Sequence, residues 1–495
     1  MESIESLVSF FKNRLTSVTK KLGLSALKSN AIMLISLSSA GFLSLLVSID
    51  IARSLGVEEF GVYSMIISIQ TIFSLFAGFS IGTAAGKYVS EYRVRNEVQA
   101  REFAKTGLVL LFLFSAISFC VYLMLADVIG NQLYHTPSIV GLIPLSGMVM
   151  FSTAAWSTVI GIAQGCQRIR LLAFMQVASP GLSLLTIVLL LPYFGMNGIF
   201  IGFFVSQSVV SGVAITSLNA SDFPFLAHQT KILDPVVGRK LLSFAVPSVI
   251  ASLIVGPVYW FGNTTLTLTN GFEALGFFAV AVVFFQSLGV LSNSITIPLV
   301  PKVSELSVGS SERVEILVSG TFKAGSSLIF PIVFGMALFS GYIVSFLYGP
   351  KYSTSREMVY LMVTASYFAI LSSIVSAMII GIGRMWVNLT LDIVWAVSFV
   401  VIALVAISPY GGAGLAVAYT GSYAIFLIAK LAVSKRVLNL DLSGVNRIVA
   451  VSGLFFLLGY IVNFYSSGSN LAINLALLLI GTIVLLGISR NLRLS

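Results

Sequence analysis

The sequence contains few charged residues. Asp, Glu, Lys and Arg make up 9% of its 495 residues, against about 25% in a typical soluble domain. A water-soluble protein of this length would form two or three domains, each with a charged surface around its core. A chain that is 57% hydrophobic cannot supply those surfaces. The composition therefore excludes a soluble globular protein and predicts a chain that folds in lipid.

Cysteine and histidine are also scarce. Cys120 and Cys166 lie in or beside apolar segments, so neither a disulfide framework nor a cysteine-based metal site is expected. His135 and His228 fall in predicted loops, and no cluster of acidic residues surrounds either one to form a base or a metal site. We therefore expect no metal, no cofactor and no enzymatic activity.

Long apolar runs dominate the remainder. A helix needs about 20 residues to cross a hydrocarbon core of about 30 Å, and we identify fourteen such runs. They begin near residues 30, 62, 107, 138, 171, 198, 241, 273, 319, 357, 386, 412, 447 and 471. The predicted fold is an all-α polytopic membrane protein with about 14 transmembrane helices.

The basic residues divide unequally between the two sides of this arrangement. Alternate segments hold 25 of the 28, and the other side receives only Arg53, Lys351 and Arg356. The positive-inside rule then places both termini in the cytoplasm of a cell-membrane protein. This distribution also accounts for the net charge of +10, so nucleic-acid binding is not expected.

Residues 1–29 do not read as a cleavable signal peptide, because Glu2 and Glu5 come first and no apolar core follows. Apolar residues recur at helical spacing from Ile4 to Leu22, with lysines mostly off that stripe. The pattern predicts a cytoplasmic helix lying in the membrane interface. An ordinary solvated arm is the alternative.

The chain also contains an internal repeat with an offset near 216. The matching segments are Glu58–Tyr63 with Glu273–Phe278, Gln70 with Gln286, Val89–Glu91 with Val303–Glu305, Gly165–Arg168 with Gly381–Arg384, and Pro192–Gly195 with Pro409–Gly412. The offset duplicates six spans. Because six is even, both halves share one orientation and their pseudo-two-fold axis runs along the membrane normal.

The repeat predicts the domain organisation. An N-lobe of spans 1–6 and a C-lobe of spans 7–12 would enclose a central cavity, which is an architecture of transporters. The predicted units are an interfacial helix (1–29), the N-lobe (30–220), a cytoplasmic linker (221–240), the C-lobe (241–434), and spans 13 and 14 with a cytoplasmic C-terminus (435–495).

Several segments resemble a known family. The run Ala52–Ser64, the span end Gly82–Glu91, the segment Pro301–Glu305 and the Pro-Tyr turns at 192 and 409 are similar to the polysaccharide-transporter, or oligosaccharide-flippase, family of the multidrug/oligosaccharidyl-lipid/polysaccharide (MOP) exporter superfamily. The resemblance implies alternating access and transfer of a lipid-linked oligosaccharide to the outer leaflet. A multidrug or small-molecule cation antiporter is the main alternative, and a polysaccharide polymerase or ligase is less favoured.

Uncharged polar residues in the predicted spans are candidates for lining a sugar cavity. A sugar hydroxyl that enters an apolar medium without a partner costs roughly 2–7 kcal/mol, so a flippase needs hydrogen-bonding groups along the path. The candidates are Gln70, Asn263, Gln286 and Asn293. The alternative is that these side chains hold helices together.

Asp50 is the candidate for coupling to H+ or Na+. It lies near the outer end of the first span, where the multidrug branch of the superfamily has an acidic residue used in cation coupling. The alternative is an ion pair with Arg53. Asp392 is expected to pair with Arg384 at a span end.

Four basic residues lie near predicted cytoplasmic mouths of spans: Lys87, Arg168, Lys323 and Arg384. They are candidates for receiving a lipid phosphate, and anchoring at the interface is the alternative. The run Gly82–Tyr88 lacks the spacing and the Ser or Thr of a phosphate-binding loop, so ATP is not expected. The expected partners are the bilayer, the lipid-linked substrate and other membrane proteins of polysaccharide assembly.

The topology can be tested with reporter fusions. We expect fusions in the loops after spans 1, 3, 7 and 13 to report an extracytoplasmic position, because the basic residues mark the opposite side. A cytoplasmic signal from any of these four loops would contradict the fourteen-span arrangement.

Overall fold

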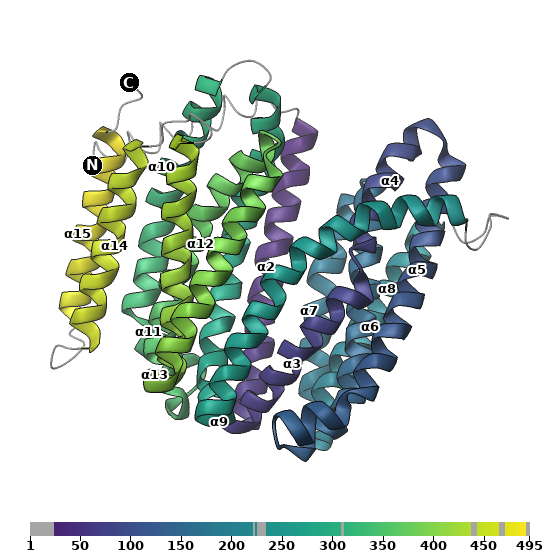
Figure 1. Ribbon diagram of the computed structural model, residues 1–495, viewed down its shortest axis with the longest axis horizontal. Coiled ribbons are helices and arrows are strands. Elements are labelled where there is room, and N and C mark those ends of the chain that lie inside the picture. Colours follow the sequence, from purple (N-terminus) through teal and green to yellow (C-terminus); the bar gives the residue numbers. More distant parts are fainter. Residues whose placement is uncertain are drawn as a thin grey trace.

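The computed structural model describes residues 24–220, 223–224, 234–307, 311–436, 443–464 and 471–491, and these are almost entirely α-helical (Figure 1). In lipid every backbone polar group must be satisfied within the protein, which favours long helices. The helices are α2 (Leu24–Leu55), α3 (Val57–Gly78), α4 (Ile81–Arg95), α5 (Glu97–Met124), α6 (Pro137–Gly165), α7 (Ile169–Phe194), α8 (Met196–Ala220), α9 (Pro235–Ser307), α10 (Ser311–Leu338), α11 (Ser340–Leu347), α12 (Ser355–Gly381), α13 (Met385–Arg436), α14 (Ser443–Phe464) and α15 (Leu471–Asn491).

Twelve stretches in the described part of the chain are long and apolar enough to cross a membrane. The prediction was fourteen, and the difference arises in α9 and α13. Each of these contains one residue with non-helical backbone angles, Gly271 or Gly411, and so has two arms. The all-helical membrane fold is confirmed, while the count of fourteen crossings stays a prediction.

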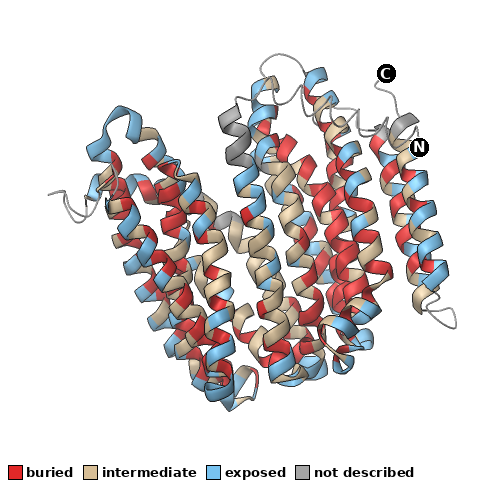
Figure 2. Ribbon diagram, turned by 180° about the vertical axis from the view of Figure 1, so that it is seen from behind, coloured by how far each residue is buried: buried red, intermediate tan, exposed pale blue. Residues whose placement is uncertain are grey.

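The surface of the bundle is apolar. Exposed side chains on α5, α7 and α13 include Phe112, Leu185 and Val405, which fits contact with lipid tails. Burial is concentrated inside the bundle, most of all on α12, and pale exposed positions lie on the outer faces (Figure 2). The predicted interfacial helix falls mostly outside the described residues, which begin within it at Leu24 as part of α2.

The backbone confirms the internal repeat. Gly56 and Gly271, 215 residues apart, have φ of 83° and 84° with ψ near 180°, a region that is essentially restricted to glycine. Gly195 and Gly411, 216 apart, share φ of 54° and ψ of −137° and −129°. The two halves therefore break their helices at equivalent positions with the same backbone geometry.

The repeats meet where α3 crosses the second arm of α9. A Cβ added at Gly61 would lie 1.9 Å from the carbonyl oxygen of Phe272, and a Cβ at Gly276 would lie 1.9 Å from that of Val57. Both glycines are therefore required for backbone-to-backbone contact. The contact is reciprocal, as a two-fold relation between the repeats demands.

Away from this crossing, the helices form two groups that diverge towards the other end of the molecule (Figure 1). The first turns of α9 span the gap: Val237, Leu241 and Ala245 are buried in the same cluster as residues of α4, α5 and α6. The segment 234–240, predicted as part of a linker, is thus largely helical and packs on the N-lobe. Helices α14 and α15 pack on α10 at the far flank of the C-lobe.

We expect Gly61→Ala to destabilise the protein, because its Cβ would push α3 away from α9. Overpacking of this kind costs typically about 1–3 kcal/mol, measurable as a lower thermal unfolding temperature of the purified protein. Gly141→Ala on α6 is the matched control, since nothing lies within 4 Å of its added Cβ. Equal unfolding temperatures for the two variants would contradict the close crossing.

Candidate functional site

A cavity of about 550 Å³ lies between the lobes. Helices α2, α3, α7 and α8 line one side, and both arms of α9 and the second arm of α13 line the other. It is therefore built from helices that belong to both halves of the repeat. A rearrangement of one lobe against the other would change its shape.

The lining carries no charged side chain and mixes apolar residues with uncharged hydrogen-bonding groups. Among the described residues that line the cavity there is no Asp, Glu, Lys or Arg. Its hydrogen-bonding groups are chiefly hydroxyls and two amides: Ser44, Ser48, Ser64, Ser68, Thr71, Ser183, Ser287, Asn263 and Gln286. Such groups can bond to the hydroxyls of a neutral ligand in both directions, as donors and as acceptors.

Aromatic rings form part of the wall. Tyr259 and Tyr419 both line the cavity and stack at 5.2 Å with an angle of 2° between their planes. The Tyr259 hydroxyl is hydrogen-bonded to that of Tyr423 at 2.7 Å. Tyr63 faces the same cavity from α3. These rings provide flat apolar surfaces beside the polar groups.

Two of the four predicted polar residues line the cavity, and the other two do not. Asn263 lines the cavity and donates from Nδ2 to the Ser68 hydroxyl at 3.0 Å, which joins α9 to α3, while its Oδ1 is buried without a partner. Gln286 also lines the cavity. Gln70, its counterpart in the repeat, is 7% exposed and is not in the lining, and Asn293 is exposed elsewhere on α9.

Asp50 lies on α2 between Ser48 and Ile51 in sequence, but it is not part of the cavity lining. One of its carboxylate oxygens, Oδ2, is buried without a hydrogen-bond partner. The alternative partner, Arg53, instead donates to the carbonyl oxygen of Phe346 on α11 at 2.7 Å. The role of Asp50 in cation coupling stays a prediction.

The four predicted phosphate-binding cations do not converge on the cavity, since none of them belongs to its lining. The Lys87 ammonium lies 4.3 Å from the ring centre of Phe244 and 4.8 Å from that of Tyr88. Arg168 precedes α7, Arg384 is exposed before α13, and Lys323 lies on α10. The structure shows them spread over separate helices.

Sequence reasoning missed Lys240, which lies next to Lys87. Its ammonium donates to the Tyr92 hydroxyl at 3.1 Å, and this hydrogen bond raises the pKa of Lys240. Lys87 and Lys240 are thus held against aromatic rings where the start of α9 packs on α4. The signal that would have found this contact is the apolar spacing of residues 237–245, which reads as a helix.

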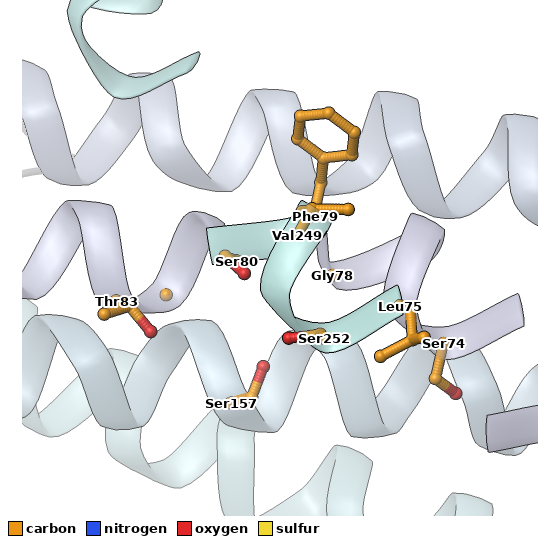
Figure 3. A pocket seen from close by; sticks show the side chains of 10 residues that line it. Ser74, Leu75, Gly78, Phe79, Ser80, Thr83, Ser157, Val249 and Ser252 are labelled. Carbon is orange, nitrogen blue, oxygen red and sulfur yellow. The ribbon is translucent and has the colours of Figure 1, made fainter. Parts of the chain in front are cut away.

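A second, smaller cavity of about 180 Å³ lies at the break between α3 and α4 (Figure 3). Phe79 and Ser80 both adopt left-handed backbone angles there, with φ of 41° and 50°, which costs roughly 1–2 kcal/mol for each non-glycine residue. Its hydroxyls come from three neighbouring segments: Ser74, Ser80 and Thr83 beside the break, Ser157 on α6 and Ser252 on α9.

Lys430 counts among the 25 basic residues that the sequence places in cytoplasmic segments, but α13 continues to Arg436 and Lys430 is only 1% exposed. Asp392, expected to pair with Arg384, instead accepts a hydrogen bond from Asn388 at 3.0 Å. Asn388 and Asp392 lie one turn apart on α13, so their side chains are within hydrogen-bonding distance.

Comparison with known proteins identifies the family. The family model described as polysaccharide biosynthesis protein matches residues 27–307, more than half of the chain. The chain belongs to the polysaccharide biosynthesis protein family. It is 22% identical over 398 residues, 77% of this chain and 87% of the relative, to the EPS I polysaccharide export inner membrane protein EpsE of Ralstonia nicotianae.

Solved structures share the fold. The lipid II flippase MurJ in an inward closed conformation matches with a TM-score of 0.72 and 14% identity, over 94% of this chain and 99% of MurJ. An inward-facing multidrug resistance MATE family transporter of the MOP superfamily matches with a TM-score of 0.63 and 17% identity, over 80% and 94% of the two chains. The protein is a multi-pass membrane protein that shares its fold with these flippase and transporter structures.

The cavity assignment can be tested by labelling introduced cysteines. In a background with Cys120 and Cys166 replaced, we expect Gln286→Cys to react readily with a small water-soluble methanethiosulfonate, because it lines the cavity. Gln70→Cys is the control, since it occupies the equivalent repeat position but is buried outside the lining. Equal labelling rates, measured by mass spectrometry, would contradict this assignment.

Proposed function

We propose that this protein moves a lipid-linked oligosaccharide, carried on a polyprenyl phosphate or pyrophosphate, from the cytoplasmic to the outer leaflet of the cell membrane by alternating access. The observation that carries the proposal is the uncharged, hydroxyl-rich cavity between the lobes. The EpsE relative is named as a polysaccharide export protein, and MurJ is named as a flippase. Both names favour a saccharide cargo and a transport role.

The energetics of the cargo explain why such a cavity is needed. Each unpartnered sugar hydroxyl costs roughly 2–7 kcal/mol in an apolar medium, so a sugar of several residues does not cross hydrocarbon unaided. The serines, Asn263 and Gln286 of the lining would replace part of its hydration. The polyprenyl tail has no need of a polar path and stays in the lipid.

Direction requires a source of free energy, and we propose that an H+ or Na+ gradient supplies it through Asp50. Oδ2 of this carboxylate is buried without a hydrogen-bond partner, so binding of an ion or a proton would remove the free-energy cost of burying an uncompensated charge. Binding would also favour whichever arrangement of the lobes holds the neutralised site. The opposite arrangement of the lobes would then release the ion.

Export of a cationic drug is the alternative, because a multidrug resistance MATE family transporter has a similar fold. The cavity lining counts against it, because a buried cation needs opposite charges close by. Among the described residues, none that line the cavity is acidic, and Asp50 lies outside the lining on α2. A neutral glycan fits these surroundings better than an organic cation does.

The proposal predicts the phenotype of a strain that lacks this protein. We expect lipid-linked oligosaccharide to accumulate in the inner leaflet and surface glycan to be lost, since the sugar cannot cross without a polar path. Extraction and mass spectrometry of the lipid-linked pool would measure the first, and surface staining the second. Unchanged surface glycan together with altered drug sensitivity would assign the protein to drug export instead.

Variants expressed in the same strain refine the test. Asn263→Leu should restore export roughly two- to tenfold less well than the unaltered protein, as loss of one hydrogen bond predicts, and Asp50→Asn should remove the dependence on an ion gradient. Asn293→Leu is the matched control, because Asn293 is exposed outside the cavity. Full rescue by Asn263→Leu at equal expression would count against this cavity as the sugar path.

A further inference from the structure

Lys430 carries a long cationic side chain in the interior of the C-lobe. It lies six residues before the end of α13 and is 1% exposed. Its ammonium donates to the Ser376 hydroxyl and, at 3.4 Å, to the carbonyl oxygen of Ser372, both on α12. The ring of Phe426 covers it at 3.5 Å. Two oxygens and a ring face therefore surround the charge in place of water.

A buried ammonium is unfavourable unless an opposite charge compensates it. Asp392, on the first arm of α13, interacts electrostatically with Lys430. In the part of the chain that the structure describes, the two side chains make no direct ion pair. The buried ammonium thus bonds to α12, and its counter-charge is the partly buried carboxylate on the other arm of α13.

The surroundings of Asp392 are also rich in oxygen acceptors. Asn388, one turn earlier, donates from Nδ2 to Oδ2 of Asp392 at 3.0 Å, and its own Oδ1 is buried without a partner. With the carbonyl of Ser372 and the hydroxyl of Ser376, the group offers a carboxylate, an amide oxygen, a carbonyl and a hydroxyl. Oxygen groups of this kind replace the hydration shell of a monovalent cation.

This group lies close to the cavity without being part of its lining. Trp395, one turn after Asp392, packs edge-on against the cavity residue Tyr259 at 5.5 Å and lies 5.6 Å from Tyr423. Tyr423 in turn shares a hydrogen bond with Tyr259. Two tyrosines and one tryptophan therefore separate the charges from the space where the cargo would lie.

We propose that the ammonium of Lys430 is a tethered cation that takes the place of a free monovalent ion: the oxygens of Ser372 and Ser376 bind it, and the carboxylate of Asp392 balances its charge. The lysine supplies the positive charge that a free ion would otherwise bring, and it keeps this part of the C-lobe electrically neutral. The C-lobe then holds its helices together without binding Na+ or K+. The inference concerns the stability of the lobe and is independent of the cargo.

The test is to remove the tethered cation and look for a free ion that replaces it. The purified full-length protein is unfolded by heat at pH 8 in sodium, potassium or choline chloride at equal ionic strength. We expect the unaltered protein to unfold at one temperature in all three salts. Lys430→Met should unfold several degrees lower in choline and recover part of that loss in sodium or potassium, in a saturable manner.

Two controls accompany this measurement. Lys351→Met removes an exposed lysine of the same half of the chain and should behave like the unaltered protein in all three salts. Lys430→Met combined with Asp392→Asn should show no ion-specific recovery, because the carboxylate that attracts the ion is gone. The inference is overturned if sodium and potassium do not raise the unfolding temperature of Lys430→Met above its value in choline. It is also overturned if these ions raise the unfolding temperature of the unaltered protein by as much as that of Lys430→Met.

A second comparison applies if Lys430→Met does not yield folded protein. Asp392→Asn leaves the buried ammonium without its counter-charge and should lower the unfolding temperature. Adding Lys430→Met to Asp392→Asn removes that charge as well, so the double variant should be more stable than Asp392→Asn alone. A double variant that is no more stable than Asp392→Asn would show that the two charges do not compensate one another, and would refute the proposal.

Discussion

The contact between the two repeats at Gly61 and Gly276 is the constraint on which the rest of the structure depends. Each glycine admits the carbonyl oxygen of the opposite repeat, so α3 and α9 approach as closely as two helices can. At this end no room is left between the lobes, and the helices diverge from here (Figure 1). The cavity exists because the lobes are joined at one end and separate beyond it.

The distribution of charge follows from the same arrangement. The hydrogen-bonding groups of the cavity are hydroxyls and amides, whereas these charged side chains lie outside its lining: Asp50 on α2, and Asp392 and Lys430 on α13. A fixed charge facing the cavity would hold its own water or a counter-ion and would compete with a neutral cargo. Charges outside the lining leave the path neutral.

Much of this architecture could be predicted from sequence, since long apolar runs and the glycine-containing repeat are local patterns. The repeat also predicted that Gln70 and Gln286 would be equivalent, and it was misleading there: only Gln286 lines the cavity, because the two lobes do not present equivalent helix faces to it. Lys430 was misplaced because the basic residues 435 and 436 marked a span end, and the end of a helix is not the end of its buried part. The positions of Gln70 and Lys430 depend on how distant helices pack, which a local sequence pattern does not show.

The break at Phe79 and Ser80 is the clearest difference between the lobes. Four other positions of positive φ recur about one repeat later, at Gly56, His135, Gln167 and Gly195, but α9 remains helical across the residues equivalent to this break. Of two homologous segments, one is a continuous helix and the other is interrupted. The duplicated halves are therefore mechanically unequal, because the N-lobe has a point of bending that the equivalent helix of the C-lobe lacks.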